Sequence, residues 1–263
     1  VMWGQSGTNK AVEELVNHGF ENVRWIENDN ECIYTIENNV YRAQGVGIAQ
    51  ALDIIQKHGL STEKRCKVIV THLEVPELSL TYHPNECDTI GVADKRRWET
   101  CYEVGDSWDF IKKEKAKNSS RFKVDILVYP QLSFKNLIIT QIYQVLFTLN
   151  PAIEVSLWPG MKLTGQVIIP VYNDGYGYLQ DKVHPGFITL SQRFRLPYNI
   201  KGKATIGYFS ADRYGADLML FYPFKDERFS LEGRIGAVAI GYWNEFKLHY
   251  DTEFSTTWSL GGN

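Results

Sequence analysis

Two carboxylates near the C-terminus have the residue types and the spacing that acid–base chemistry requires. Asp251 and Glu253 are two positions apart in an alternating stretch, so a β-strand would place both on one face. Lys247 and His249 fall on the same face of that strand, and ion pairing therefore explains the carboxylates better than catalysis does. The stretch predicts a charged strand face without a catalytic residue.

No other pattern indicates a catalytic, metal or cofactor site. The histidines are scattered without metal-ligand spacing, and no GxSxG nucleophile motif is present. GQSGTNK has glycines too close together for a phosphate loop, and QGVGIAQA lacks the strand context of a dinucleotide site. We expect Cys32 and Cys66 to be buried thiols, while Cys87 and Cys101 could be bridged in an oxidising compartment. We therefore predict a protein without enzymatic activity, cofactor or metal.

Length and composition favour a β-rich protein and argue against broad nucleic-acid binding. The chain has 263 residues, 44% of them hydrophobic, which suffices for one or two domains with a sizeable core. Its formal net charge of −3 disfavours a nucleic-acid partner. The sequence contains no run of about 18 apolar residues, so it predicts no transmembrane helix. The alternating strands of a membrane barrel would not produce such a run either.

Residues 1–83 predict a small α/β module in the order α-β-β-α-β-β. One helix is expected from Ser6 or Thr8 to about residue 17 and another over about 46–57, with Ile48, Leu52 and Ile55 on its buried stripe. The second helix should close at Gly59. The strands NVRWIE, ECIYTIE, CKVIVTHLEV and ELSLTYH complete an α+β module. The charged segment 84–120 lacks periodicity and is interpreted as a linker or insertion.

Residues 121–263 alternate apolar and polar positions, which predicts eight or nine antiparallel strands in an up-and-down order. The stretch Ile153–Val171 keeps one phase but is too long for a single strand. We expect a three-residue turn at Trp158–Gly160 that pairs Leu157 with Met161 and leaves Gly160 left-handed; a bulged single strand is the alternative. Further turns are expected at NPA, YNIKG and KDER, and FKLHYDTEFSTTWSL is expected to be one strand.

Alternation alone leaves open whether the apolar face meets lipid or a protein core, because a membrane barrel and a soluble β-sandwich share the same period. Three features favour the barrel: the other face carries charges of both signs, aromatic residues gather near strand ends, and the alternating segments reach about ten residues or more. The predicted fold class is therefore an α+β N-terminal module followed by an antiparallel up-and-down transmembrane β-barrel, complete or partial in this chain.

Several segments resemble the YjbH/GfcD family of outer-membrane proteins, which are tied to exopolysaccharide and group 4 capsule production. The resemblance lies in GFENVRWIENDNECIYTIENNVYR, GIAQALDII, EVSLWPGMKLTGQVIIPVYN, PGFITLSQRFRLP and GYFSADRYGADLMLFYPFKDERFSL. It implies a periplasmic module at 1–83 and outer-membrane barrel strands at 121–263, in a Gram-negative bacterium and without enzymatic activity. Because family members are longer and have more strands, the barrel is expected to be incomplete here. The implied partners are an exopolysaccharide, other components of a polysaccharide export system and the lipid bilayer.

This resemblance and the alternation together suggest roles for two groups of residues. Charged positions on the polar face would line the barrel interior: Glu154, Lys162, Arg193, Arg195, Asp217, Glu232, Arg234, Lys247, Asp251 and Glu253. Tyrosines in the long loop 172–186 would stack on sugars or lie in the membrane interface: Tyr172, Tyr176 and Tyr178. The alternative function is a soluble β-sandwich that binds carbohydrate; an enzyme such as a polysaccharide lyase would need a Tyr, His and Arg cluster in one groove.

Overall fold

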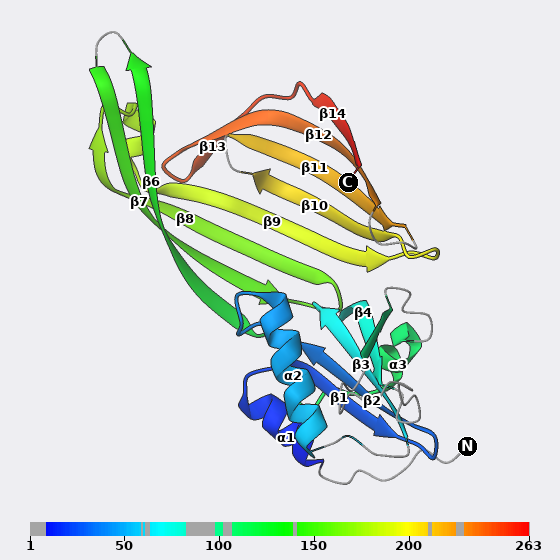
Figure 1. Ribbon diagram of the computed structural model, residues 1–263. Helices are drawn as coiled ribbons and strands as arrows, with labels where there is room; N and C mark the ends of the chain where they lie inside the picture. Colours follow the sequence, from blue (N-terminus) through cyan, green and yellow to red (C-terminus); the bar gives the residue numbers. More distant parts are fainter. Residues whose placement is uncertain are drawn as a thin grey trace. The chain divides into compact units, whose positions relative to one another are not determined.

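Antiparallel β-sheet dominates the computed structural model of the chain, which describes residues 9–58, 60, 64–82, 98–101, 107–138, 141–209, 212–224 and 229–262 (Figure 1). The chain separates into two units, one formed by Val1–Ser120 and Pro197–Asn199, the other by Arg121–Leu196 and Ile200–Asn263. Few helices accompany the sheets, and within the described ranges none is long and apolar enough to cross a membrane. The prediction of a largely antiparallel β protein is confirmed at this level.

The N-terminal unit contains a five-stranded sheet with the order β1-β2-β3-β4-β5. In chain order its elements are α1 (Lys10–Asn17), β1 (Glu21–Glu27), β2 (Glu31–Glu37), α2 (Gln44–His58), β3 (Arg65–His72), β4 (Val75–Tyr82), β5 (Trp98–Cys101) and α3 (Ser107–Lys113). Neighbouring strands are antiparallel except β2 and β3, which are parallel and are joined by α2 as a helical crossover.

The two longer helices lie on one face of this sheet and cover its core (Figure 1). Asn9 is the N-cap of α1, and its side chain accepts a hydrogen bond from the Ala11 N–H at 2.8 Å. The predicted caps at Ser6 and Thr8, and the predicted stop at Gly59, lie outside the described residues. On α2 the buried residues are Gly47, Ala51, Ile54 and Ile55. The predicted stripe is therefore rotated, because Ile48 and Leu52 flank the contact and are only half-buried.

The strand cysteines are buried, as predicted, and they lie opposite one another. Cys32 of β2 and Cys66 of β3 are ladder partners in the parallel pair. The indole N–H of Trp25 donates to Cys32 Sγ at 3.2 Å. The hydrogen bond with Cys32, together with burial, raises the pKa of the Cys66 thiol. Both cysteines belong to the buried apolar core of this unit. Cys87 lies outside the described residues, and its bridge to Cys101 remains a prediction.

The segment 84–120, predicted to be a linker or insertion, contributes described elements to this unit. β5 extends the sheet beside β4, and Ile111 of α3 is buried. The Asn118 side chain accepts from the Val23 N–H at 3.1 Å, and the Ser120 N–H donates to Asn22 Oδ1 at 3.0 Å. These bonds fasten residues 118–120 to β1, so the end of the segment is part of the fold of the unit.

A buried ion pair holds β1 to the turn between β3 and β4. Arg24 and Glu74 are each 3% exposed, and the Arg24 guanidinium contacts the Glu74 carboxylate through Nη2. Its Nη1 donates to the Asn22 carbonyl at 3.1 Å and its Nε to the Glu114 carbonyl at 2.9 Å. Every guanidinium nitrogen therefore has an acceptor, which compensates the loss of hydration of the charge.

We expect Arg24→Met to lower the free energy of unfolding of this unit by about 3–5 kcal/mol, because Glu74 would keep a buried, uncompensated charge. Hydrogen exchange of the β2 and β3 amides in the full chain measures this change as a faster opening. Arg65→Met is the matched control, since Arg65 pairs with Glu31 while 53% exposed; it should cost less than about 1 kcal/mol. Equal effects of the two substitutions would contradict the role given to burial.

The second unit is a single antiparallel sheet of nine strands. β6 (Val124–Ile138), β7 (Gln141–Ser156), β8 (Met161–Asp174), β9 (His184–Arg195), β10 (Lys201–Phe209), β11 (Arg213–Pro223) and β12 (Ser230–Asn244) pair in chain order. Both β13 (Lys247–Tyr250) and β14 (Ser255–Gly262) then pair with β12. The short 3-10 helix η1 (Tyr178–Asp181) lies in the loop between β8 and β9. Among the described residues no pairing joins β6 to β13 or β14, so this sheet is not a closed barrel.

The turn predicted at Trp158–Gly160 is confirmed. The Leu157 N–H donates to the Met161 carbonyl at 3.2 Å, the Met161 N–H donates to the Trp158 carbonyl at 2.8 Å, and Gly160 has φ +81°. The Gly160 carbonyl in turn accepts from the Arg193 N–H at 2.7 Å, so the turn also joins β9. A Cβ at Gly160 would lie 2.1 Å from the Arg193 carbonyl oxygen, which only glycine avoids.

The predicted turn at Asn150–Ala152 is wrong, because β7 runs unbroken for 16 residues. Asn150 and Pro151 have ladder partners on β6 but none on β8. Pro151 therefore occupies a gap in one ladder, where its missing N–H does not cost a strand hydrogen bond. Asn-Pro favours a turn, but β7 continues as a strand because it pairs with β8 both before and after this gap.

The predicted single strand at 246–260 is also wrong, because it is interrupted between β13 and β14. Tyr250 pairs with Gly241 and Ser255 with Val238. Four residues, 251–254, thus lie opposite the two residues 239 and 240 of β12, which is a two-residue bulge. Since an insertion of two residues preserves the alternation, the apolar positions of β13 and β14 stay on the same face.

Gly160→Ala should lower the free energy of unfolding of the full chain by about 1–3 kcal/mol, because alanine must adopt a left-handed conformation against a backbone oxygen. Urea unfolding followed by the β-sheet circular dichroism signal measures this. The control is Gly165→Ala on β8, where an added Cβ meets nothing within 4 Å. A Gly160→Ala variant as stable as the control would exclude the strained turn.

Candidate functional site

The sheet of the second unit has an apolar face that is exposed along its whole width. We define the apolar face by ladder partners, with Ile153, Leu163, Leu190, Ala204, Leu218 and Ile235 at its centre. Large side chains on it are strongly exposed: Ile126 72%, Ile206 54%, Ile235 53%, Trp258 80% and Leu260 70%. A soluble sheet buries its apolar side chains, so this face has the inverse of the usual exposure.

The contrast between the two faces is clear along β11. Ala216, Leu218 and Leu220 are exposed, whereas Asp217 and Met219, which point to the other side, are half-buried. On this strand the apolar side chains are therefore the more exposed ones, and the side chains of the opposite face are partly shielded. This arrangement suits a sheet whose apolar face contacts hydrocarbon rather than water.

Aromatic side chains lie at both ends of the apolar face. At the end with the β10–β11 and β12–β13 turns, Tyr208 packs edge-on against Trp243 at 5.6 Å and Tyr214 against Phe254 at 5.6 Å. Tyr222 lies toward the opposite end of β11, in contact with Phe224 at 5.1 Å. Tyr214 and Tyr222 are eight residues apart, roughly 26 Å along an extended strand. At a barrel tilt of about 35–45°, this length corresponds to a height of roughly 18–21 Å, which is less than the apolar band of about 25 Å in outer-membrane barrels.

The opposite face of the sheet, here the charged face, collects most of the residues predicted to line an interior. Ladder partners place Lys162 beside Ser191, Thr205 and Asp217 in one row, and Arg193 beside Lys203, Met219 and Arg234 in the next. Lys247 joins this face through its partner Asn244. The predicted positions that share the face are Glu154, Lys162, Arg193, Arg195, Asp217, Glu232, Arg234 and Lys247.

Two predicted positions do not belong to the strand face. Asp251 and Glu253 lie in the bulge between β13 and β14, and the Asp251 carboxylate accepts from the Glu253 N–H at 3.2 Å. The Asp251 carbonyl accepts from the Tyr214 hydroxyl at 2.5 Å. Both residues therefore shape a local turn, and their placement on a continuous strand is wrong.

Two lysines of the charged face were not predicted. Lys201 and Lys203 lie on β10 opposite Arg195 and Arg193. Their strand is hard to recognise because Gly202 and the small Ala204 occupy its apolar positions and weaken the alternation signal. The signal that could have revealed it is the period of two in KGKATIG, where Lys201, Lys203 and Thr205 alternate with the small and apolar residues.

Ion pairs bind part of this charge within the sheet. Lys162 pairs with Glu154 across β7 and β8, and Arg234 Nε lies 2.6 Å from Asp217 Oδ2 across β11 and β12. Lys203 lies between these pairs, as the ladder partner of Arg193 on one side and of Met219 on the other. The charged face thus contains ion pairs between neighbouring strands, with further basic residues between those pairs.

The three predicted loop tyrosines have different environments. Tyr172 lies on the apolar face as the ladder partner of Phe147, near the end of β8. The ring of Tyr176 is covered by Lys135 Nζ at 4.6 Å, and the ring of Tyr178 by Lys182 Nζ at 4.6 Å. Tyr172 therefore has an interfacial position, while a sugar would have to displace a lysine from either of the other two rings.

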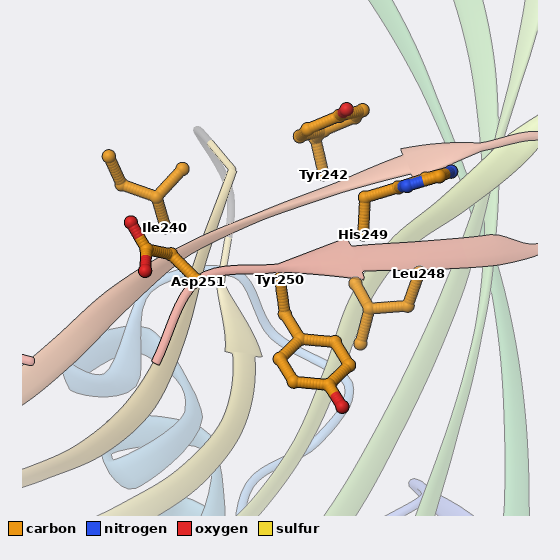
Figure 2. Close-up of a pocket in the computed structure, with 6 residues that line it drawn as sticks. All are labelled: Ile240, Tyr242, Leu248, His249, Tyr250 and Asp251. Atoms are coloured by element: carbon orange, nitrogen blue, oxygen red, sulfur yellow. The ribbon is translucent and has the colours of Figure 1, made fainter. Parts of the chain in front are cut away.

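A pocket at the β12–β13 hairpin presents an aromatic surface on the charged face (Figure 2). Tyr242 and His249 stack with ring centroids 5.1 Å apart and planes 10° from parallel. They point to one side of the hairpin, whereas Leu248 and Tyr250 point to the other (Figure 2). Ile240 and Asp251 complete the lining. Stacked rings can receive the apolar face of a sugar. Among the described residues, no group of His, Cys, Asp or Glu could hold a metal ion.

The chain matches no known family model, and no curated protein or solved structure is significantly similar to it.

The loop between β8 and β9 is tied to the β12–β13 turn. Lys182 Nζ lies 2.7 Å from Glu245 Oε1, and this hydrogen bond, helped by the Tyr178 hydroxyl, raises the pKa of Lys182. The contact joins two connections that strands β10 and β11 separate in the sheet order.

We expect Lys182→Met to accelerate hydrogen exchange in residues 176–183, because the loop loses its ion pair and its contact with Tyr178. Lys247→Met is the control, being a lysine of the same hairpin region outside this contact. Mass spectrometry of peptides from the full chain reads both changes. Unchanged protection of the loop in Lys182→Met would show that other contacts hold it.

Proposed function

We propose that this chain is part of a non-enzymatic outer-membrane β-barrel protein of a Gram-negative bacterium that assists secretion or assembly of an exopolysaccharide or capsule. The observation that carries the proposal is the exposed apolar face of the nine-stranded sheet. Exposed aliphatic side chains between rows of aromatics are what a bilayer requires of a barrel exterior.

The charged face supports the same proposal from the other side. Water-filled barrel interiors carry polar and charged residues, and Lys162 with Glu154 and Arg234 with Asp217 show charges of both signs in contact. A soluble sandwich would instead pack a second sheet onto residues such as Ile206 and Ile235, which are more than half exposed. The exposure therefore favours lipid over a protein core.

Completion of the barrel is part of the proposal. Unpaired strand edges are not tolerated within a bilayer. Among the described residues, β6 at one edge and β13 and β14 at the other have no outer neighbour, so the proposal requires further strands there, from additional chain or from a partner. In this proposal the N-terminal unit faces the periplasm and contacts other export components, and the exopolysaccharide passes or is assembled beside the charged face. These assignments are what the resemblance of the sequence segments to the YjbH/GfcD family implies.

Two neighbouring residues of β10 test the orientation of the sheet. Ile206 is 54% exposed on the apolar face, whereas Thr205 faces the other side as the ladder partner of Asp217. We expect Ile206→Arg to impair membrane assembly, because arginine on the lipid face costs about 2–4 kcal/mol near the bilayer midplane. Thr205→Arg should assemble normally, since it adds a charge to a hydrated face beside a carboxylate.

Fractionation of cells expressing the full-length gene product reads the result. Retention in the outer membrane after a carbonate wash, and a mobility shift on boiling, mark assembled protein. Loss of both properties in Ile206→Arg alone supports the proposal. A wild-type protein that is soluble without detergent, or equal behaviour of the two variants, refutes it and makes a soluble carbohydrate-binding protein the better account.

A further inference from the structure

Two buried cysteines of the N-terminal unit lie side by side in its sheet. Cys32 is the second residue of β2, Cys66 is the second residue of β3, and the two are ladder partners in the parallel pair. Cys32 is 3% exposed and Cys66 is fully buried. Their thiols are hydrogen-bonded to each other. The fold therefore brings together two free thiols that the α2 crossover separates in the sequence.

The backbone at these two positions is compatible with a disulfide bond. Paired strands lie about 4.7–4.9 Å apart, and the Cα atoms of bridged cysteines are usually about 4.4–6.8 Å apart. As direct partners in a ladder, Cys32 and Cys66 also point to the same face of the sheet, the one that carries the core of the unit. The two sulfurs can therefore bond without a change in the register of the strands.

Hydrogen bonds around the pair make Cys32 the more acidic of the two thiols. The hydrogen bond from Cys66 lowers the pKa of Cys32, and hydrogen bonds from the Tyr34 hydroxyl and the Trp25 indole lower it further, against the opposing effect of burial. The Trp25 N–H lies 3.2 Å from the Cys32 sulfur. The pKa of Cys66, by contrast, is raised. Since the thiolate is the nucleophile in disulfide exchange, Cys32 is the sulfur expected to react first.

The pair is buried but lies close to the ends of its strands. The turn 28–30 before β2 is exposed, and so is Arg65, the first residue of β3. Two contacts join these ends: Arg65 Nη2 lies 3.0 Å from Glu31 Oε2, and the Arg65 N–H donates to the Asn30 carbonyl at 3.2 Å. The cysteines are therefore among the first core residues that fraying of the strand ends reaches.

We propose that Cys32 and Cys66 form an intramolecular disulfide when the chain is in an oxidising compartment. The Cys32 thiolate attacks one sulfur of an external disulfide, forms a mixed disulfide and releases one thiol. The Cys66 thiolate then attacks the Cys32 sulfur, which closes the Sγ–Sγ bond and releases the second thiol. Two cysteine thiols are thereby oxidised and one external disulfide is reduced. The protons of the two cysteines pass to the two thiols that are released.

The bond would join β2 to β3, the parallel pair of the five-stranded sheet. It would close a loop of chain that contains α2, which lowers the entropy of the opened state and so stabilises the folded unit. In reducing surroundings the unit would lack this stabilisation. The inference concerns the N-terminal unit alone, so it goes beyond the proposed function and does not depend on membrane insertion of the other unit.

Peptide mapping of the full-length gene product tests the bond directly. One sample is equilibrated with excess glutathione disulfide and a disulfide isomerase, another with excess reductant, and free thiols are then alkylated in denaturant. Trypsin places the two cysteines in separate peptides, residues 25–42 and residues 66–67. We expect these peptides joined in the oxidised sample and separately alkylated in the reduced one. Alkylation of both cysteines in the oxidised sample, or their linkage to Cys87, Cys101 or glutathione, would overturn the proposal.

Hydrogen exchange of the full-length gene product measures what the bond does to the fold. We expect the β2 and β3 amides of the oxidised protein to exchange at least roughly thirtyfold more slowly than those of the reduced protein, because the cross-link disfavours opening. Cys32→Ala with Cys66→Ala should abolish this difference between oxidising and reducing conditions. An unchanged difference in that double variant would contradict the proposal.

Cys101→Ser is the matched control, because it removes the exposed thiol of β5 and leaves the buried pair intact. This variant should keep both the joined peptides and the slower exchange under oxidising conditions. Loss of either property in Cys101→Ser would assign the redox-active thiol to Cys101 and overturn the proposal. Should the double alanine variant fail to fold, peptide mapping of the wild-type protein and of Cys101→Ser still decides the result.

Discussion

The second unit depends on one constraint: every strand must keep its apolar side chains on the same side of the sheet. A shift of one residue in pairing would move a whole row of aliphatic side chains to the charged face. The connections preserve this phase. The turn at Trp158–Gly160 sets Leu157 opposite Met161, and the bulge at 251–254 inserts two residues rather than one. Since β7 to β14 agree in phase at their centres, a continuous apolar surface results.

The charged face follows from the same constraint, because residues that avoid the apolar side have only one other side to occupy. Pairing then decides which charges meet. Asp217 reaches Arg234 and Glu154 reaches Lys162, while Arg193 meets Lys203 as a like-charge pair. The face is therefore both internally paired and locally cationic. A hydrated environment tolerates this combination, and a dry protein core would not.

The N-terminal unit follows the rules of a soluble domain. Its apolar side chains lie between two helices and a sheet, and its buried charges are matched by hydrogen bonds. Glu37, which is 1% exposed, accepts from the Asn22 side chain and from the Leu73 and Glu74 N–H groups. The N-terminal unit thus buries its apolar side chains, whereas the sheet of the other unit exposes them.

Local sequence determined the period of the strands, the hairpin at Gly160, the burial of Cys32 and Cys66 and the division of most charged residues from apolar ones. These properties depend on neighbours along the chain, which can be read directly from the sequence. Prediction from local sequence was wrong where the pairing between strands decides the structure. Asn150–Ala152 has turn propensity, yet a gap in the ladder absorbs Pro151. Asp251 and Glu253 alternate like strand residues, yet β12 offers only two residues opposite 251–254.

Only the tertiary structure brought Lys203 beside Arg193 and Tyr242 onto His249, because these neighbours lie on different strands and their contact depends on register. The same is true of Cys32 and Cys66, which meet across a parallel pair joined by a helix. A sequence specifies which face a strand residue takes through its own period of two. Which residues share that face at contact distance is set by the register of the ladders, and the turns and bulges between the strands decide that register.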